Sequence, residues 1–171
     1  PVKVAAHLAF GLVVIAAQED GAGIGRIRMR RIHRAEAKEL IPFVQESVES
    51  GTTIRTDGWS AYSSLSKQGY PHDTVFLKDD STLMPRVHRV ASLLKRWLIG
   101  THQGAVSHEQ LDYYLDEFTF RFNRRSSRYR GKLFYRLVQQ AVTVAPVPYG
   151  GLRGKRRHGK RNALGLPESS A

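Results

Sequence analysis

Residues 11–30 read GLVVIAAQEDGAGIGRIRMR, an apolar run followed by a turn signal and an alternating run. The Asp20–Gly21 dipeptide favours a tight turn between two extended segments. In the second segment, RIRMR at residues 26–30, arginines alternate with apolar residues, so one face is apolar and the other is cationic. The stretch therefore predicts a β-hairpin, and its row of arginines faces either solvent or a DNA backbone.

Helical and extended patterns alternate after the hairpin. Residues 35–49 have apolar residues at helical spacing and contain Pro42, which kinks a helix or restarts it. The β-branched runs GTTIRTD at 51–57 and HDTVFL at 72–77 predict strands, and AYSSLSKQGY at 61–70 predicts a helix between them. The order strand, strand, helix, strand, helix, strand indicates an α/β fold with a mixed sheet.

The second half of the chain is predicted to form helices that pack on this sheet. Residues 84–98 carry an apolar stripe at helical spacing, namely Val87, Val90, Leu94 and Leu98. Another helix begins at a capping box formed by Ser107 and Gln110. Its apolar and aromatic stripe is assigned to the core rather than to base stacking, and comprises Leu111, Tyr114, Leu115, Phe118 and Phe122.

Length and charge bound the domain count and the class of partner. At 171 residues and 41% hydrophobic, the chain suffices for one compact domain plus a tail. Residues after 144 are rich in Pro, Gly and cations without periodicity, so we predict a domain over 1–144 and a basic, disordered tail over 145–171. The net charge of +12 favours nucleic acid as the partner; a charge that serves only solubility is the alternative.

Composition also excludes two kinds of site. Disulfides and cysteine-based zinc sites are excluded within this chain because it contains no cysteine. The longest apolar stretch, residues 4–17, is shorter than the ~18 residues that a membrane span needs. We therefore expect no membrane segment and a cytoplasmic, nucleoid-associated protein.

The stretch TDGWSAY at residues 56–62 raises the question of what Asp57 does. Asp57 follows a predicted strand, and α/β folds place ligands at the carboxyl ends of strands. Asp-Gly is also a common turn dipeptide, so Asp57 forms either a turn or part of a metal site. A second group for such a site lies on the following helix, where His88 and Lys95 are seven residues apart and share one face.

TDGWSAY, together with VHRVASLLKRWLIGTHQGAVSHEQLDYYLDEFTFRFNRR at residues 87–125, resembles the catalytic core of bacterial insertion-sequence transposases of the ISXO-like group. This group lies within the DDE superfamily, and the similarity extends over residues 11–140. The resemblance implies a ribonuclease-H-like fold and double-stranded DNA, as transposon ends and target, for the substrate. It also implies that copies of the protein assemble on DNA.

The resemblance further implies a mechanism dependent on Mg²⁺ or Mn²⁺. Such transposases use two ions held by acidic residues to activate water, and later a DNA 3′-hydroxyl, for attack on a phosphodiester. Asp57 matches the family's second acidic position, His88 matches the third ligand position, and Lys95 matches a helix lysine that contacts phosphate. Because imidazole suits softer metals than Mg²⁺, His88 binds the metal, meets a phosphate or is an ordinary structural histidine, while Lys95 is otherwise a solvated cation.

The basic patch that ends the resembling segment is the predicted DNA contact. Its cations are Arg121, Arg124, Arg125, Arg128 and Arg130. Glu117, just before them, matches a recurrent family position, and pairing with a nearby arginine is its favoured role.

The family's first catalytic aspartate has no counterpart in this sequence. Relatives carry it on a strand before the run at 11–18, in a stretch resembling VDETY, whereas this chain reads PVKVAAHLAFG there. We therefore expect a ribonuclease-H-like fold that lacks its first strand and is incomplete at the N-terminus. With a carboxylate missing, two-metal catalysis should fail because both charge neutralisation and positioning are lost.

Three functional hypotheses remain open from the sequence. The first is a transposase catalytic domain, incomplete or inactive in this chain, and the second is a catalytically dead remnant that still binds DNA. The third is a basic α/β module that binds RNA, which a preference for RNA over duplex DNA would identify.

Overall fold

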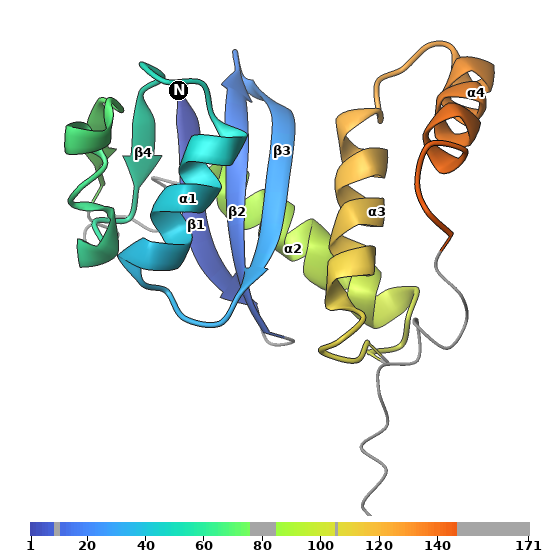
Figure 1. Cartoon of the computed structure of the whole chain (residues 1–171), viewed down its shortest axis with the longest axis horizontal. Coiled ribbons are helices and arrows are strands. Elements are labelled where there is room, and N and C mark those ends of the chain that lie inside the picture. Colours follow the sequence, from blue (N-terminus) through green and yellow to red (C-terminus); the bar gives the residue numbers. More distant parts are fainter. Residues whose placement is uncertain (9–10, 76–84, 105, 147–171) are drawn as a thin grey trace, which may run out of the picture. The chain divides into compact units, whose positions relative to one another are not determined.

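The computed structural model describes residues 1–8, 11–75, 85–104 and 106–146. Its centre is a five-stranded sheet with the strand order β3-β2-β1-β4-β5. The strands are β1 (Val2–Leu8), β2 (Gly11–Asp20), β3 (Gly23–Ile32), β4 (Ile54–Thr56) and β5 (His72–Thr74). The first three strands are antiparallel neighbours, whereas β4 runs parallel to β1 and β5 runs parallel to β4 (Figure 1). The α/β class predicted from the sequence is confirmed.

The predicted hairpin forms the β2–β3 half of this sheet. Asp20 pairs with Gly23, and Gly21 adopts a φ of +52°, in the left-handed region that glycine enters without a steric penalty. The strands are longer than the periodicity indicated, because each continues to the turn itself. The dipeptide Asp20–Gly21 therefore marked the turn correctly.

The expectation that the sheet lacks its first strand is not confirmed. Val2–Leu8 forms a strand at the centre of the sheet, between β2 and β4. The longest apolar stretch, residues 4–17, carries no turn signal that separates two strands. In the structure, this run contributes to two adjacent antiparallel strands.

Three helices cover the two faces of the sheet. Helix α1 (Ala37–Ser47) lies on one face, and α2 (Pro85–Gly100) and α3 (Leu111–Asn123) lie on the other (Figure 1). The predicted helix at 61–70 is instead two short 3₁₀ turns, η1 (Ser60–Tyr62) and η2 (Ser66–Gln68).

Each face of the sheet has its own apolar core, as alternation along the strands requires. The α1 core includes Val4, Val14, Ile32, Phe43 and Tyr62. The α2–α3 core includes Val13, Ile15, Ile27 and the predicted stripe Val87, Val90, Leu94 and Leu98, all of it buried. In α3, Leu111, Leu115 and Phe122 are buried, and Tyr114 and Phe118 pack against the same core. The assignment of these side chains to the core is confirmed.

The chain divides into two compact units, Pro1–Arg128 and Tyr129–Ala171. The described part of the second unit contains α4 (Arg130–Ala141), whose large apolar side chains are exposed. The boundary predicted after residue 144 remains a prediction, because residues 147–171 lie outside the described residues. Within the part of the chain that the structure describes, no helix is long and apolar enough to cross a membrane.

Candidate functional site

Asp57 is the first residue after β4, at the carboxyl end of a short strand that lies beside the central strand. Its carboxylate is half-buried, and Oδ1 accepts a hydrogen bond from the Trp59 backbone N–H at 3.3 Å. Gly58 between them has a φ of +80°, so the local backbone is a tight turn that an Asx hydrogen bond stabilises. The turn role of Asp57 is therefore real, and it uses one of the two carboxylate oxygens.

Trp59 fixes this turn to another part of the molecule. Its indole N–H donates to the Ala35 carbonyl at 2.8 Å, in the segment before α1, although the side chain is 56% exposed. The TDGWSAY stretch is thus tethered at both Asp57 and Trp59. This tether holds the Asp57 carboxylate at the end of the sheet rather than on a loose loop.

The backbone register shows which residue accompanies Asp57 on the central strand. Val4 of β1 is the partner of Thr56 in the parallel β1–β4 pair. The pairing ends there, and the next residues along the two segments are Ala5 in β1 and Asp57 after β4. The residue of β1 that follows the last paired position is therefore an alanine, whose side chain has no oxygen to offer a cation.

Tyr62, which the sequence did not indicate as a site residue, lies close enough to Asp57 to feel its charge. Its side chain is 2% exposed, and its hydroxyl has no hydrogen-bond partner in the described structure. Burial, and then the negative charge of Asp57, raise the pKa of the Tyr62 phenol well above its usual range. The Asp57 charge thus acts on a buried polar group, but this tyrosine stays protonated and cannot replace a missing carboxylate.

Thr56 of β4 and His72 of β5 form a polar pair that was not predicted from the sequence. The buried Thr56 Oγ1 is 2.9 Å from Nε2 of His72 in β5 and accepts the Gly58 N–H at 3.3 Å. Burial lowers the pKa of His72, and the nearby Asp73 opposes this shift, so the neutral imidazole is favoured. The pair organises the β4–β5 edge. Only the β-branched run around residue 54 hinted at it in the sequence.

His88 and Lys95 occupy the exposed side of α2. Both side chains are exposed, whereas the buried stripe of α2 faces the sheet. The predicted shared face is consistent with this placement. Neither side chain has a hydrogen bond or ion pair in the part of the chain that the structure describes.

The described residues do not supply a complete cation site around Asp57. They contain no group of three or more His, Cys, Asp or Glu side chains that could hold a metal ion. Asp57 and His88 would be the ligands from the sequence, and the residue of β1 after the last paired position is Ala5. A hard cation such as Mg²⁺ needs more oxygen ligands than this donor set provides.

The basic patch at the end of α3 contains three arginines that contact other residues of the domain. Arg121 pairs with Glu117 at 3.1 Å, as predicted for that glutamate, and Arg124 stacks over the Phe120 ring at 3.9 Å. Arg125 lies over the Phe122 ring at 4.0 Å and donates to the carbonyls of Ile24 and Phe122. These three remain predicted DNA contacts, but each already has a partner within the domain.

The last two predicted DNA contacts differ from these. Arg128 is exposed and has no partner among the described residues. Arg130 begins α4, in the second unit, and its side chain lies outside the described part of the structure. Both also remain predictions.

Asn123, in the RFNRR segment, binds the backbone of β3 through its side-chain amide. Its Oδ1 accepts the Ile27 N–H at 2.7 Å, and its Nδ2 donates to the Ile27 carbonyl at 3.0 Å. The side-chain amide thereby replaces a neighbouring strand along the open edge of β3. Arg125 binds the adjacent carbonyl of Ile24 on the same edge.

Cations without a protein partner gather instead on α2. The exposed side chains of Arg89, Lys95 and Arg96 have no ion pair in the described structure. Arg89 and Arg96 line two grooves between α2 and α3 that share Leu93, Phe122 and Arg125. This helix therefore offers positive charge on the outside of the domain, where a polyanion can reach it.

Comparison with known families gives one match. The model of the ISXO2-like transposase domain matches residues 11–123, which is more than half of the chain. The matched range includes Asp57, His88, Lys95 and Asn123. No curated protein matches the chain.

Proposed function

Since this chain belongs to the ISXO2-like transposase domain family, we propose that it is the ribonuclease-H-like DNA-binding domain of an insertion-sequence transposase, and that its described residues do not form a working two-metal site. The family implies DNA as the substrate. The sheet supports the fold proposal, because an antiparallel β1–β2–β3 meander is extended by two parallel strands with helices on both faces.

The observation that carries the proposal is the alanine that follows the last β1–β4 pair, which joins Val4 and Thr56. In a transposase of this kind, metal ions held by carboxylates stabilise the charge on the transferring phosphoryl group. Asp57 follows β4, as such a ligand would, but the residue of β1 after the last paired position is Ala5. The described residues do not fit the two-ion site, so the proposed activity is DNA binding.

Positive charge on α2 supports this activity. Arg89, Lys95 and Arg96 are exposed and unpaired within the described structure, so they are available for phosphate contacts. The net charge of +12 attracts a polyanion over longer range. The assembly of copies on DNA and association with the nucleoid are parts of the same proposal.

The test is a pair of assays on the intact chain with duplex DNA carrying element ends. We expect binding whose affinity falls steeply as salt rises, and no nicking with Mg²⁺ or Mn²⁺. An Arg89→Ala/Arg96→Ala double variant should reduce the salt dependence by about one unit per lost phosphate contact. Binding that does not weaken with salt, or a preference for RNA, would overturn the proposal.

Catalysis is the second candidate, and the placement of Asp57 at the end of β4 favours it. It predicts metal-dependent nicking that disappears in an Asp57→Ala variant. That result would show that other residues complete the site despite Ala5.

A further inference from the structure

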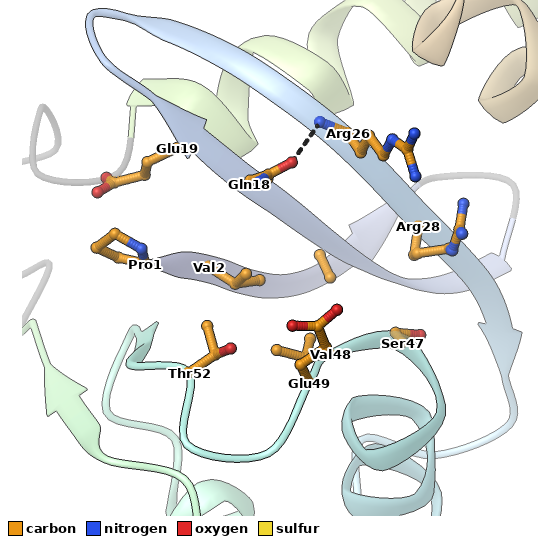
Figure 2. A pocket seen from close by; sticks show the side chains of 11 residues that line it. Pro1, Val2, Gln18, Glu19, Arg26, Arg28, Ser47, Val48, Glu49 and Thr52 are labelled. Atoms are coloured by element: carbon orange, nitrogen blue, oxygen red, sulfur yellow. Dashed lines mark hydrogen bonds between the residues drawn. The ribbon is translucent and has the colours of Figure 1, made fainter.

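A second polar site lies at the opposite end of the sheet from Asp57. An open cavity of about 420 Å³ lies at the amino ends of β1 and β4, where Val2 begins β1 and Thr52 precedes β4. Arg26 and Arg28 of β3 form one wall, and Ser47, Glu49 and Thr52 form the other (Figure 2). Asp57 follows the carboxyl end of β4, so the two sites are separate.

The arginines of this wall differ from their neighbours on β3. Arg30 pairs with Glu46 and lies over the Phe43 ring, and Arg31 pairs with Asp112 at 2.8 Å. The guanidinium groups of Arg26 and Arg28 have no ion pair or hydrogen bond in the described structure. Of the three arginines on this face of β3, Arg30 is therefore neutralised by the protein, whereas the two beside the cavity, Arg26 and Arg28, are not.

The geometry of the strand places these two charges together. Residues two apart on a strand point to the same face, and their Cα atoms are about 7 Å apart. Two guanidinium groups on neighbouring positions of one face repel, and an anion between them removes the repulsion. Guanidinium also matches phosphate in shape and donates two parallel hydrogen bonds to it.

The opposite wall supplies neutral donors and one opposing charge. The hydroxyl groups of Ser47 and Thr52 can donate to an anion. Glu19, which also lines the cavity, is bound by Arg86 at 2.6 Å. Glu49 is exposed and has no partner within the described residues, so its carboxylate limits how tightly an anion binds.

We propose that this cavity binds a phosphate group, which Arg26 and Arg28 hold from one side and Ser47 and Thr52 from the other. The phosphate belongs to a nucleic-acid strand or to a free phosphate compound, since the recognition chemistry is the same. The site is independent of the metal chemistry and of the DNA interface on α2. It does not rest on the proposed function.

The first experiment is a titration of the intact, ¹⁵N-labelled chain with inorganic phosphate, followed by NMR. We expect saturable shifts of the Arg26 and Arg28 side-chain N–H signals, and affinity at least about tenfold lower in an Arg26→Ala/Arg28→Ala variant. The matched control is Lys38→Ala/Lys67→Ala, which removes two exposed charges outside the cavity. Equal losses in both variants, or no saturable binding, would overturn the proposal.

Glu49 gives a test with the opposite sign. Glu49→Gln removes the opposing charge and should tighten phosphate binding several-fold, whereas Glu109→Gln makes the same charge change at an exposed position away from the cavity and should not. Equal affinities in these two variants would contradict the assignment.

Competition distinguishes the two sources of phosphate. A short 5′-phosphorylated oligonucleotide that displaces inorganic phosphate identifies a nucleic-acid strand, and failure to displace it identifies a free phosphate compound. Asp57→Ala removes a negative charge at the other end of the sheet and should leave the phosphate affinity unchanged; tighter phosphate binding in that variant would place the ion at the Asp57 end and overturn the proposal. DNA cleavage plays no part in any of these readouts.

Discussion

The β3 edge and the Asp57 end of the sheet both carry family-like sequence, yet they are built in opposite ways. At the β3 edge, Asn123 satisfies both backbone groups of Ile27, and Arg125 binds the Ile24 carbonyl. At the Asp57 end, the buried Tyr62 hydroxyl has no partner in the described structure, and the residue of β1 after the last β1–β4 pair is Ala5. One motif completes the fold, whereas the other leaves polar groups available. A sequence stretch that resembles a family can therefore reflect a structural role, as at Asn123, as well as a catalytic one.

Removing the Asn123 side chain from the β3 edge should have the largest effect on the free energy of unfolding. Asn123→Ala removes two hydrogen bonds and leaves the part-buried N–H and carbonyl of Ile27 without their partner, which should cost about 2–4 kcal/mol of unfolding free energy. Urea denaturation measures it. Asn123→Asp keeps the acceptor and loses the donor, so its cost should be intermediate. Equal stability of all three proteins would refute the strand-replacing role.

Arg125 tests the same edge with a charged side chain. Arg125→Ala loses its hydrogen bonds to β3 and its contact with the Phe122 ring, which should cost about 2 kcal/mol. The control is Arg128→Ala, since Arg128 is exposed and unpartnered within the described residues and its loss should change stability by less than about 0.5 kcal/mol. If DNA contact were the main role of Arg125, both variants would be equally stable and Arg125→Ala would bind DNA more weakly.

The Asp57 end of the sheet can be tested by adding a second carboxylate near Asp57. Ala5→Asp supplies this acid from β1 and should create a weak Mn²⁺ site. Mn²⁺ at about ten times its Kd should then stabilise the variant by about 1.4 kcal/mol, measured as a shift in Tm. The same addition should not stabilise the natural chain or the Ala5→Asp/Asp57→Asn double variant. Stabilisation of the natural chain by Mn²⁺ would mean that a cation site already exists.

The Tyr62→Phe substitution should have the smallest effect on stability, and that effect should depend on pH. The pKa of Tyr62 is raised above its ordinary value of 10.0, so the folded state holds the phenol proton more tightly than the unfolded chain does. The linked stability is complete below pH 10 and is lost as the pH rises above it. Tyr62→Phe should match the natural chain within about 1 kcal/mol at pH 7 and lose less stability than it between pH 10 and 11.

Tyr70 is the matched control for that measurement. Its hydroxyl donates to the Val48 carbonyl at 3.1 Å, so Tyr70→Phe should cost about 1 kcal/mol at pH 7. A Tyr62→Phe variant that is equally destabilised would show that the Tyr62 hydroxyl has a partner.

Local patterns predicted the parts of the fold whose partners are close in sequence. The Asp20–Gly21 turn, the α2 stripe and the α3 stripe all appear in the structure, because periodicity reports which residues face a core. The boundary between β1 and β2 was missed, since small apolar residues continue across it. The segment at 61–70 was also misassigned, as its two short 3₁₀ turns resemble a helix in composition.

The candidate site was predictable only in part, for a related reason. Asp57 was expected to follow a strand and to form either a turn or part of a metal site; it follows β4 and forms the turn, while its role in a metal site stays a prediction. The roles of Asn123 and Arg125 depend on carbonyl and N–H groups about a hundred residues earlier in the chain, and no local pattern reveals them. A cluster of arginines looks the same in sequence whether it faces phosphate or a strand edge.

The parallel pairing of β1 with β4 also has a consequence for the order of folding. β1, β2 and β3 are joined by short connections, whereas β4 must return to β1 from about fifty residues away and meets it over three register positions. Loop closure of that length costs entropy before the contacts can compensate. The meander can therefore form first and act as the template onto which β4 and β5 add. We therefore expect the end that holds Asp57 to assemble last and to open first, so a ligand that binds there should also stabilise the assembled domain.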